Sequence, residues 1–244
     1  MRTLLCAGMC VVVVLGGCGG SGMAQNQKLQ KRQPPAEKAA PPAQQPPSKK
    51  PVKKNPAPPP ALTKPKPSLV EDLSPKQLEN LQAVIETSMG NITLEFFGQV
   101  APNHVRQFLR LADQGYYNGT TFSRIVKGFV IQGGNAGTWL DTNPNQKVDF
   151  ETPTLKGEFS VIPHERGTLS MARAGDDENS ATTHFFICLG RQSSLDGKYS
   201  AFGRVIEGMD VVDAIAAVKI KGGTEEPEDR VEVKTIRVIF PPEK

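Results

Sequence analysis

An arginine and a glutamine, Arg124 and Gln132, interrupt the apolar stretch TTFSRIVKGFVIQGGN at residues 120–135. The stretch is typical of two short strands around a central Lys-Gly turn, where a chain is expected to bury itself. On an alternating strand, Phe122, Arg124 and Val126 would share one face. A guanidinium stays charged and offers several N–H donors, so Arg124 is a candidate for chemistry by hydrogen bonding. Taken alone, it is best interpreted as a surface charge.

Other side chains that often carry chemistry show no catalytic or metal-binding pattern. His104, His164 and His184 are scattered without metal-ligand spacing, so we expect no metal. Cys188 lies in the apolar run HFFICLG, which predicts a buried, inert thiol. No nucleophile elbow, phosphate loop or dinucleotide-binding motif occurs, and we expect no cofactor.

The sequence around these residues predicts many short strands and two helices. AVIETSMGNITLEFF alternates on both sides of its Met-Gly-Asn centre, as in a β-hairpin. APNHVRQFLRLADQG and MDVVDAIAAVKI have helical spacing, and GTLSMARAG, HFFICLG, AFGRVIEG and VEVKTIRVIF are short strands. The fold class is therefore mainly β, and we expect one domain at residues 81–244, a closed β-barrel capped by helices.

Residues 19–80 are expected to form a disordered linker rich in proline and lysine. Fourteen of the 21 prolines lie between Pro34 and Pro75, and few bulky apolar residues could offset the entropy of ordering. Within it, Ser74-Pro75 could begin a short helix in a transition segment, residues 68–80. The linker is either a spacer that holds the domain away from a membrane or a solvated segment without a specific partner.

The basic charge of the chain belongs to this linker. Residues 25–67 carry ten Lys or Arg residues and one acid, whereas residues 68–244 carry 18 basic residues and 24 acidic ones. The folded part is therefore mildly acidic, and we expect no nucleic-acid partner.

Residues 1–18 have the layout of an export signal. Arg2 precedes an apolar run that is too short to span a bilayer, and the run ends in Leu-Gly-Gly-Cys. This ending resembles a bacterial lipobox, which would make Cys18 the lipidated first residue of the mature chain. We then expect a cell-envelope protein, lipid-anchored and extracytoplasmic. The alternative is cleavage after Ala24, which would give a secreted or periplasmic soluble protein.

The folded part resembles a cyclophilin, the peptidyl-prolyl cis-trans isomerase family. The matching segments are TTFSRIVKGFVIQGG, GTLSMARAG, HFFICLG and LDGKYSAFGRVIEGMDVVDAI, in family order over about residues 82–240. The resemblance implies an eight-stranded antiparallel barrel with a helix over each open end. It also implies isomerisation of X-Pro bonds in proline-containing polypeptides, without a cofactor, by a protein that we expect to be a monomer.

The resemblance also implies the roles of individual residues. Arg124 matches the catalytic arginine, and Gln132 matches the glutamine that positions the substrate backbone and orients that arginine. Phe129 and Phe186 match the aromatic walls of the proline pocket. The other substrate-binding positions that it implies are Val130, Ala172, Arg173, His184, Leu195 and Tyr199.

Some positions depart from the family pattern. Arg173 stands where an asparagine is usual, which predicts a preference for acidic residues beside the target proline. His184 stands where the family usually has glutamine, and it is either a neutral replacement donor or the source of a pH-sensitive groove. The acidic loop at residues 175–184 is two residues longer than usual. Ser194 replaces an aromatic residue, so weak cyclosporin binding is expected.

The sequence thus predicts a peptidyl-prolyl cis-trans isomerase that assists the folding of extracytoplasmic proteins. The alternative is a proline-peptide-binding module or scaffold of the cell envelope with little turnover.

Overall fold

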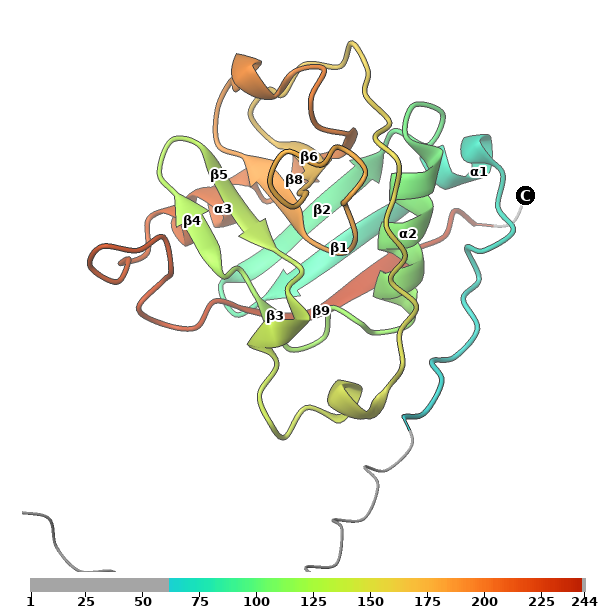
Figure 1. Cartoon of the computed structure of the whole chain (residues 1–244), viewed down its shortest axis with the longest axis horizontal. Coiled ribbons are helices and arrows are strands. Elements are labelled where there is room, and N and C mark those ends of the chain that lie inside the picture. Colours follow the sequence, from blue (N-terminus) through green and yellow to red (C-terminus); the bar gives the residue numbers. More distant parts are fainter. Residues whose placement is uncertain (1–61, 243–244) are drawn as a thin grey trace, which may run out of the picture. The chain divides into compact units, whose positions relative to one another are not determined.

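The computed structural model describes residues 62–242 (Figure 1). The signal-like segment, Cys18 and most of the predicted linker lie outside the described residues. Within residues 62–242, no helix is both long enough and apolar enough to cross a membrane. The strands are β1 (Gln82–Thr87), β2 (Gly90–Phe96), β3 (Thr120–Thr121), β4 (Arg124–Val126), β5 (Val130–Gly133), β6 (Thr168–Met171), β7 (Phe185–Cys188), β8 (Ala201–Glu207) and β9 (Glu232–Ile239). The α-helices are α1 (Pro75–Glu79), α2 (Pro102–Asp113) and α3 (Met209–Ala216).

The strands form one curled antiparallel sheet, which confirms the predicted mainly-β fold (Figure 1). Their order is β3-β9-β1-β2-β8-β6-β7-β5-β4, so the two outermost strands follow each other directly in the sequence. The described residues contain nine strands instead of the expected eight. Besides the two expected longer helices they contain α1, the short helix expected to begin at Ser74-Pro75. The extra strand arises because the segment from residue 120 to residue 126 is divided into β3 and β4.

The division of this segment lets it bond to both edges of the sheet. The N–H of Phe122 donates to Val231 O at 3.0 Å, and the N–H of Ser123 donates to Gln132 O at 3.0 Å. Phe122 is fully buried in the core, as is Ile125, whereas Arg124 is half-exposed. The prediction that Phe122 and Arg124 share one face was wrong, because strict alternation does not survive the break between β3 and β4.

An aromatic cluster fills the interior of the curled sheet. Phe108 of α2 lies at its centre, with ring centroids of Phe96, Tyr117, Phe185 and Phe202 at 5.2–5.8 Å. Helix α2 packs against β8 and β9, whereas α3 packs against β2 and β5. Two separate helices thus cover the sheet, as the family resemblance implied, and the core is held together mainly by burial of large apolar side chains.

The folded body begins before residue 81, which corrects the predicted linker boundary. Helix α1 starts with a capping box, in which the Ser74 side chain accepts from the Gln77 N–H and the Gln77 side chain accepts from the Ser74 N–H. Val70 and Leu78 are fully buried in the core. These two apolar residues were too few to stand out against the surrounding prolines and lysines in the sequence.

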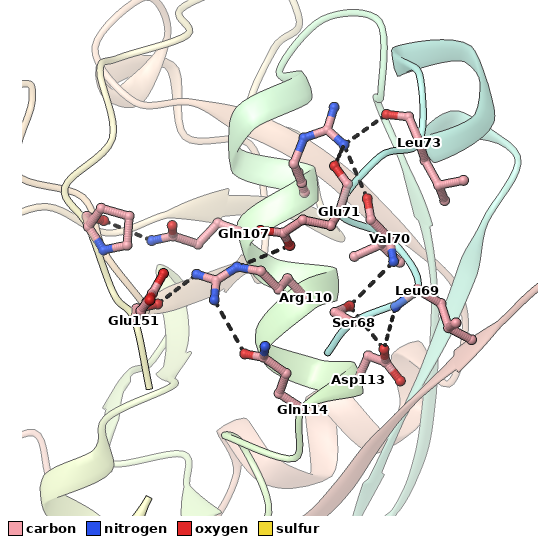
Figure 2. A network of polar contacts seen from close by, with 12 residues as sticks. Ser68, Leu69, Val70, Glu71, Leu73, Gln107, Arg110, Asp113, Gln114 and Glu151 are labelled. Carbon is pink, nitrogen blue, oxygen red and sulfur yellow. Dashed lines mark hydrogen bonds and ion pairs between the residues drawn. The ribbon is translucent and has the colours of Figure 1, made fainter. Parts of the chain in front are cut away.

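Asp113, at the last turn of α2, holds the segment that precedes α1 (Figure 2). Its carboxylate accepts from the Leu69 N–H at 3.0 Å and from the Ser68 hydroxyl at 2.9 Å. Burial opposes ionisation of Asp113, but these hydrogen bonds outweigh it, so its pKa is lowered. The carboxylate is therefore charged at neutral pH and binds the segment through charge-assisted hydrogen bonds.

Two arginines of α2 bind chain segments on opposite sides of the helix. Arg106 donates from one terminal nitrogen to the carbonyl oxygens of Val70, Glu71 and Leu73 at 2.8–3.1 Å. Arg110 donates to the carbonyl of Glu151 at 2.6 Å, on the other side of the helix (Figure 2). Helix α2 is thus bound on both sides by extended segments.

Candidate active site

One cleft of about 400 Å³ gathers every residue that the sequence assigns to the substrate groove. It is lined by Arg124, Phe129, Val130, Gln132, Ala172, Arg173, His184, Phe186, Leu195 and Tyr199, and also by Ala174, Ser180 and Thr182. The last three were not predicted as site residues. The only signal for them was the enlarged loop at residues 175–184, which Ala174 directly precedes and which contains Ser180 and Thr182.

The alternation of β5 and β7 explains why polar residues interrupt an apolar stretch. In β5, Val130 and Gln132 face the cleft, whereas Ile131 belongs to the core. In β7, Phe186 faces the cleft and Ile187 belongs to the core. The sheet therefore buries one face in the core and lines a binding cleft with the other.

Arg124 and Gln132 are brought together by strand pairing. They are direct partners in the antiparallel β4–β5 pair, so their side chains project from the same face. A terminal nitrogen of Arg124 lies 3.4 Å from the Gln132 side-chain oxygen. The pair places a permanent cation and an amide at one edge of the cleft.

The floor of the cleft is a small apolar cluster apart from the main core. It consists of Val130, Phe186, Cys188 and Leu195, with Phe129, Ala172 and Tyr199 packed against it. The rings of Phe186 and Tyr199 meet edge to face, with centroids 5.7 Å apart. Such an apolar floor suits an apolar ring and offers it few hydrogen bonds.

Part of the backbone beside the cleft is already paired within the protein. The N–H of Ala172 donates to His184 O at 2.8 Å. The Ala172 N–H is therefore not free for a substrate, and a substrate backbone has to pair with other N–H and carbonyl groups beside Ala172. The side chain of the next residue, Arg173, lies over the Tyr199 ring, with 4.7 Å from the guanidinium carbon to the ring centroid.

His184 lies in the cleft wall, where burial lowers its pKa from the ordinary value. Its ring is therefore neutral at pH 7, with one nitrogen able to donate and the other able to accept. A second histidine, His164, stacks behind Phe186, with ring centroids 6.2 Å apart. Burial lowers the pKa of His164 as well, against the opposing effect of its contact with Asp196.

A carboxylate that the sequence analysis missed contacts Arg124. The Glu225 side chain accepts from Arg124 Nε at 2.5 Å. Because 101 residues separate the two, no local pattern could have predicted the pair. The acid-rich stretch TEEPED was visible in the sequence, but its place beside the cleft was not.

The residues set aside in the sequence behave as structural groups. Cys188 is fully buried, and burial raises the pKa of its thiol to about 12. His104 is buried in α2 and contacts Glu158 at 2.7 Å. Among residues 62–242, no cluster of His, Cys, Asp and Glu side chains could hold a metal ion.

Comparison with known proteins gives a consistent result. The family profile described as "Cyclophilin type peptidyl-prolyl cis-trans isomerase/CLD" matches residues 82–238. The Arabidopsis thaliana protein "Peptidyl-prolyl cis-trans isomerase CYP18-2" is 38% identical over 160 residues, covering 65% of this chain and 93% of the relative. The Mus musculus protein "Peptidylprolyl isomerase domain and WD repeat-containing protein 1" is 39% identical over 181 residues, covering 71% of this chain. The chain spans only 27% of that longer relative.

Solved structures show the same architecture. A cyclophilin-type peptidyl-prolyl cis-trans isomerase from Cryptosporidium parvum superposes with a TM-score of 0.58 at 27% identity. The match covers 66% of this chain and 98% of that structure.

Proposed function

The chain belongs to the cyclophilin-type peptidyl-prolyl cis-trans isomerase family, and from that premise we propose that its cleft catalyses rotation about X-Pro bonds. The observation that carries the proposal is the pairing of Arg124 with Gln132 at the edge of an apolar floor. In this proposal the apolar floor binds the proline ring, and the Arg124 guanidinium donates to the imide nitrogen from the edge of that floor.

The reaction needs no bond-breaking group. An X-Pro amide is planar because its nitrogen donates into the carbonyl, which gives a barrier of about 18–20 kcal/mol to rotation. A donor aimed at that nitrogen stabilises the pyramidal transition state more than the planar ground state. Arg124 supplies such donors, and Phe129, Phe186 and Leu195 provide the walls that grip the ring.

The test is the isomerisation rate of a proline tetrapeptide with the wild-type protein and with Arg124→Ala. We expect the variant to lose on the order of 100-fold in kcat/KM, the effect of removing one preorganised donor. Arg204→Ala is the matched control, because Arg204 is exposed on β8 and pairs with Glu95, outside the cleft lining. A wild type that binds proline peptides without accelerating their isomerisation would instead favour a proline-binding module.

We propose further that the enzyme acts outside the cytoplasm, anchored by lipid on Cys18, and assists the folding of exported proteins. The support is the signal-like layout of residues 1–18 and its lipobox-like end. Mass spectrometry of the mature N-terminus tests this proposal. A diacylated N-terminal Cys18 in the wild type, and no such modification in Cys18→Ala, supports the proposal. An unmodified N-terminus that begins after Ala24 contradicts it.

A further inference from the structure

Glu225 contacts the Nε side of the Arg124 guanidinium, and Arg124 also lines the cleft. The carboxylate bonds to Nε at 2.5 Å, and one terminal nitrogen lies 3.4 Å from Gln132. A free arginine side chain samples many rotamers, and holding it in one geometry costs conformational entropy. Contacts on two sides of the guanidinium therefore restrict it to a narrow range of orientations.

Glu225 is itself held in place by the backbone. Its carbonyl accepts from the N–H of Ile125 at 2.7 Å, directly beside Arg124 in β4. The carboxylate and the arginine therefore project from two backbone segments that are hydrogen-bonded to each other.

The loop that carries Glu225 is a small, ordered hairpin. Ile220 and Pro227 form an antiparallel bridge, and the N–H of Glu228 donates to Lys219 O at 2.8 Å. Closer to the turn, the N–H of Lys221 donates to Glu226 O at 2.9 Å. Glu225 is thus presented by a folded element with its own hydrogen bonds.

Stability alone gives a weak reason for this ion pair. The side chains of Arg124 and Glu225 are 39% and 50% exposed. Ion pairs this exposed contribute little to folding, because water and salt screen them. A similar pair in the same hairpin, Lys221–Glu226 at 3.1 Å, lies outside the cleft lining, and it provides an internal comparison.

We propose that Glu225 is a positioning residue for Arg124, holding the guanidinium in its catalytic orientation before the substrate arrives. The proposal rests on the proposed isomerase function. A guanidinium that is already oriented needs no reorganisation when the amide twists. Its orientation therefore stabilises the transition state more than the bound ground state. Loss of Glu225 should therefore lower kcat and leave KM nearly unchanged.

The experiment measures kcat and KM of the full-length protein with a proline tetrapeptide. Glu225→Ala should lower kcat on the order of tenfold, as when an outer partner of a functional group is removed. Glu225→Gln keeps an acceptor oxygen and should restore part of the loss. Glu226→Ala should leave kcat unchanged, and all variants should melt within a few degrees of the wild type.

A double mutant separates positioning from other effects. On an Arg124→Ala background, Glu225→Ala should cause no further loss, because its partner is gone. An equal loss on both backgrounds overturns the proposal, as does a Glu225→Ala variant that is as fast as or faster than the wild type. If Arg124→Ala is inactive while every Glu225 variant is normal, only this inference fails. If the wild type has no activity, the proposed function fails.

Discussion

The guanidinium carbon of Arg173 lies 4.7 Å from the centroid of the Tyr199 ring, at the rim of the cleft. One of its terminal nitrogens also donates to Gly175 O at 3.1 Å. Arg173 therefore does not extend freely into the groove but forms part of its wall, with its charge fixed above an aromatic ring.

A fixed positive charge in the wall should favour acidic residues beside the target proline. We expect a higher kcat/KM for Glu-flanked peptides than for Lys-flanked ones. Arg173→Asn, which restores the residue usual in the family, should bring the ratio towards one. The measurement is the ratio of kcat/KM for the two peptides at low salt. An identical ratio in the wild type and the variant would remove Arg173 as its source.

His184 should make the groove sensitive to acid. Because burial lowers its pKa, the folded protein takes up this proton only below the ordinary value of about 6.5. The unfolded chain binds the proton first as the pH falls, so stability is retained above about pH 6.5 and declines as the pH falls through the folded pKa.

We therefore expect constant activity between about pH 8 and pH 6.5 and a decline towards about pH 5. His184→Gln should flatten the profile, apart from any decline caused by protonation of His164, whose pKa is also lowered. The check is kcat/KM across this range for both proteins. Superimposable profiles would show that the ring acts only as a neutral donor.

The segment before residue 81 should contribute to stability. Residues 62–80 supply the buried Val70 and Leu78 and the contacts to α2. Burial of two aliphatic side chains is worth about 1.5–3 kcal/mol each. We expect residues 81–244 to unfold at a lower urea concentration than residues 62–244. In residues 62–244, Leu78→Ala should lower the urea midpoint by part of the difference between the two fragments. Equal midpoints for the two fragments would mean that residues 62–80 contribute nothing to stability.

Gly134, just after β5, should tolerate no side chain. Its φ is +88°, and a Cβ there would run into the carbonyl oxygen of Thr183, next to His184 in the cleft wall. Gly128 has a similar φ of +73° with nothing near its Cβ position. Gly134→Ala should therefore lose clearly more stability and kcat than Gly128→Ala. The checks are the melting temperature and kcat of both variants. If both variants lose the same amount, the clash with Thr183 has no effect and only the backbone strain common to both sites remains, about 1–3 kcal/mol.

Local sequence patterns predicted much of the framework. The alternation in FSRIVKGFVIQGG gave the β4–β5 hairpin, and the spacing of Val105, Phe108 and Leu109 gave α2. The ten groove residues came from the family resemblance, and the structure brings all of them to one cleft. Their individual roles stay predictions.

What the sequence did not reveal depends on contacts between distant segments. Glu225 reaches Arg124 because the hairpin that carries it is hydrogen-bonded to β4, 101 residues away in the sequence. Val70 and Leu78 join the core because α2 offers them a surface, not because their own segment has a pattern. The break at Phe122 follows from a single segment bonding to both edges of the sheet.

The binding of residues 68–73 to α2 also has a mechanical consequence. A pulling force applied through the N-terminal side of the chain meets the contacts of Asp113 and Arg106 before it reaches β1, the first strand in the sequence. If the chain is anchored at its N-terminal end, as we propose, these contacts transfer the load to α2 before it reaches β1.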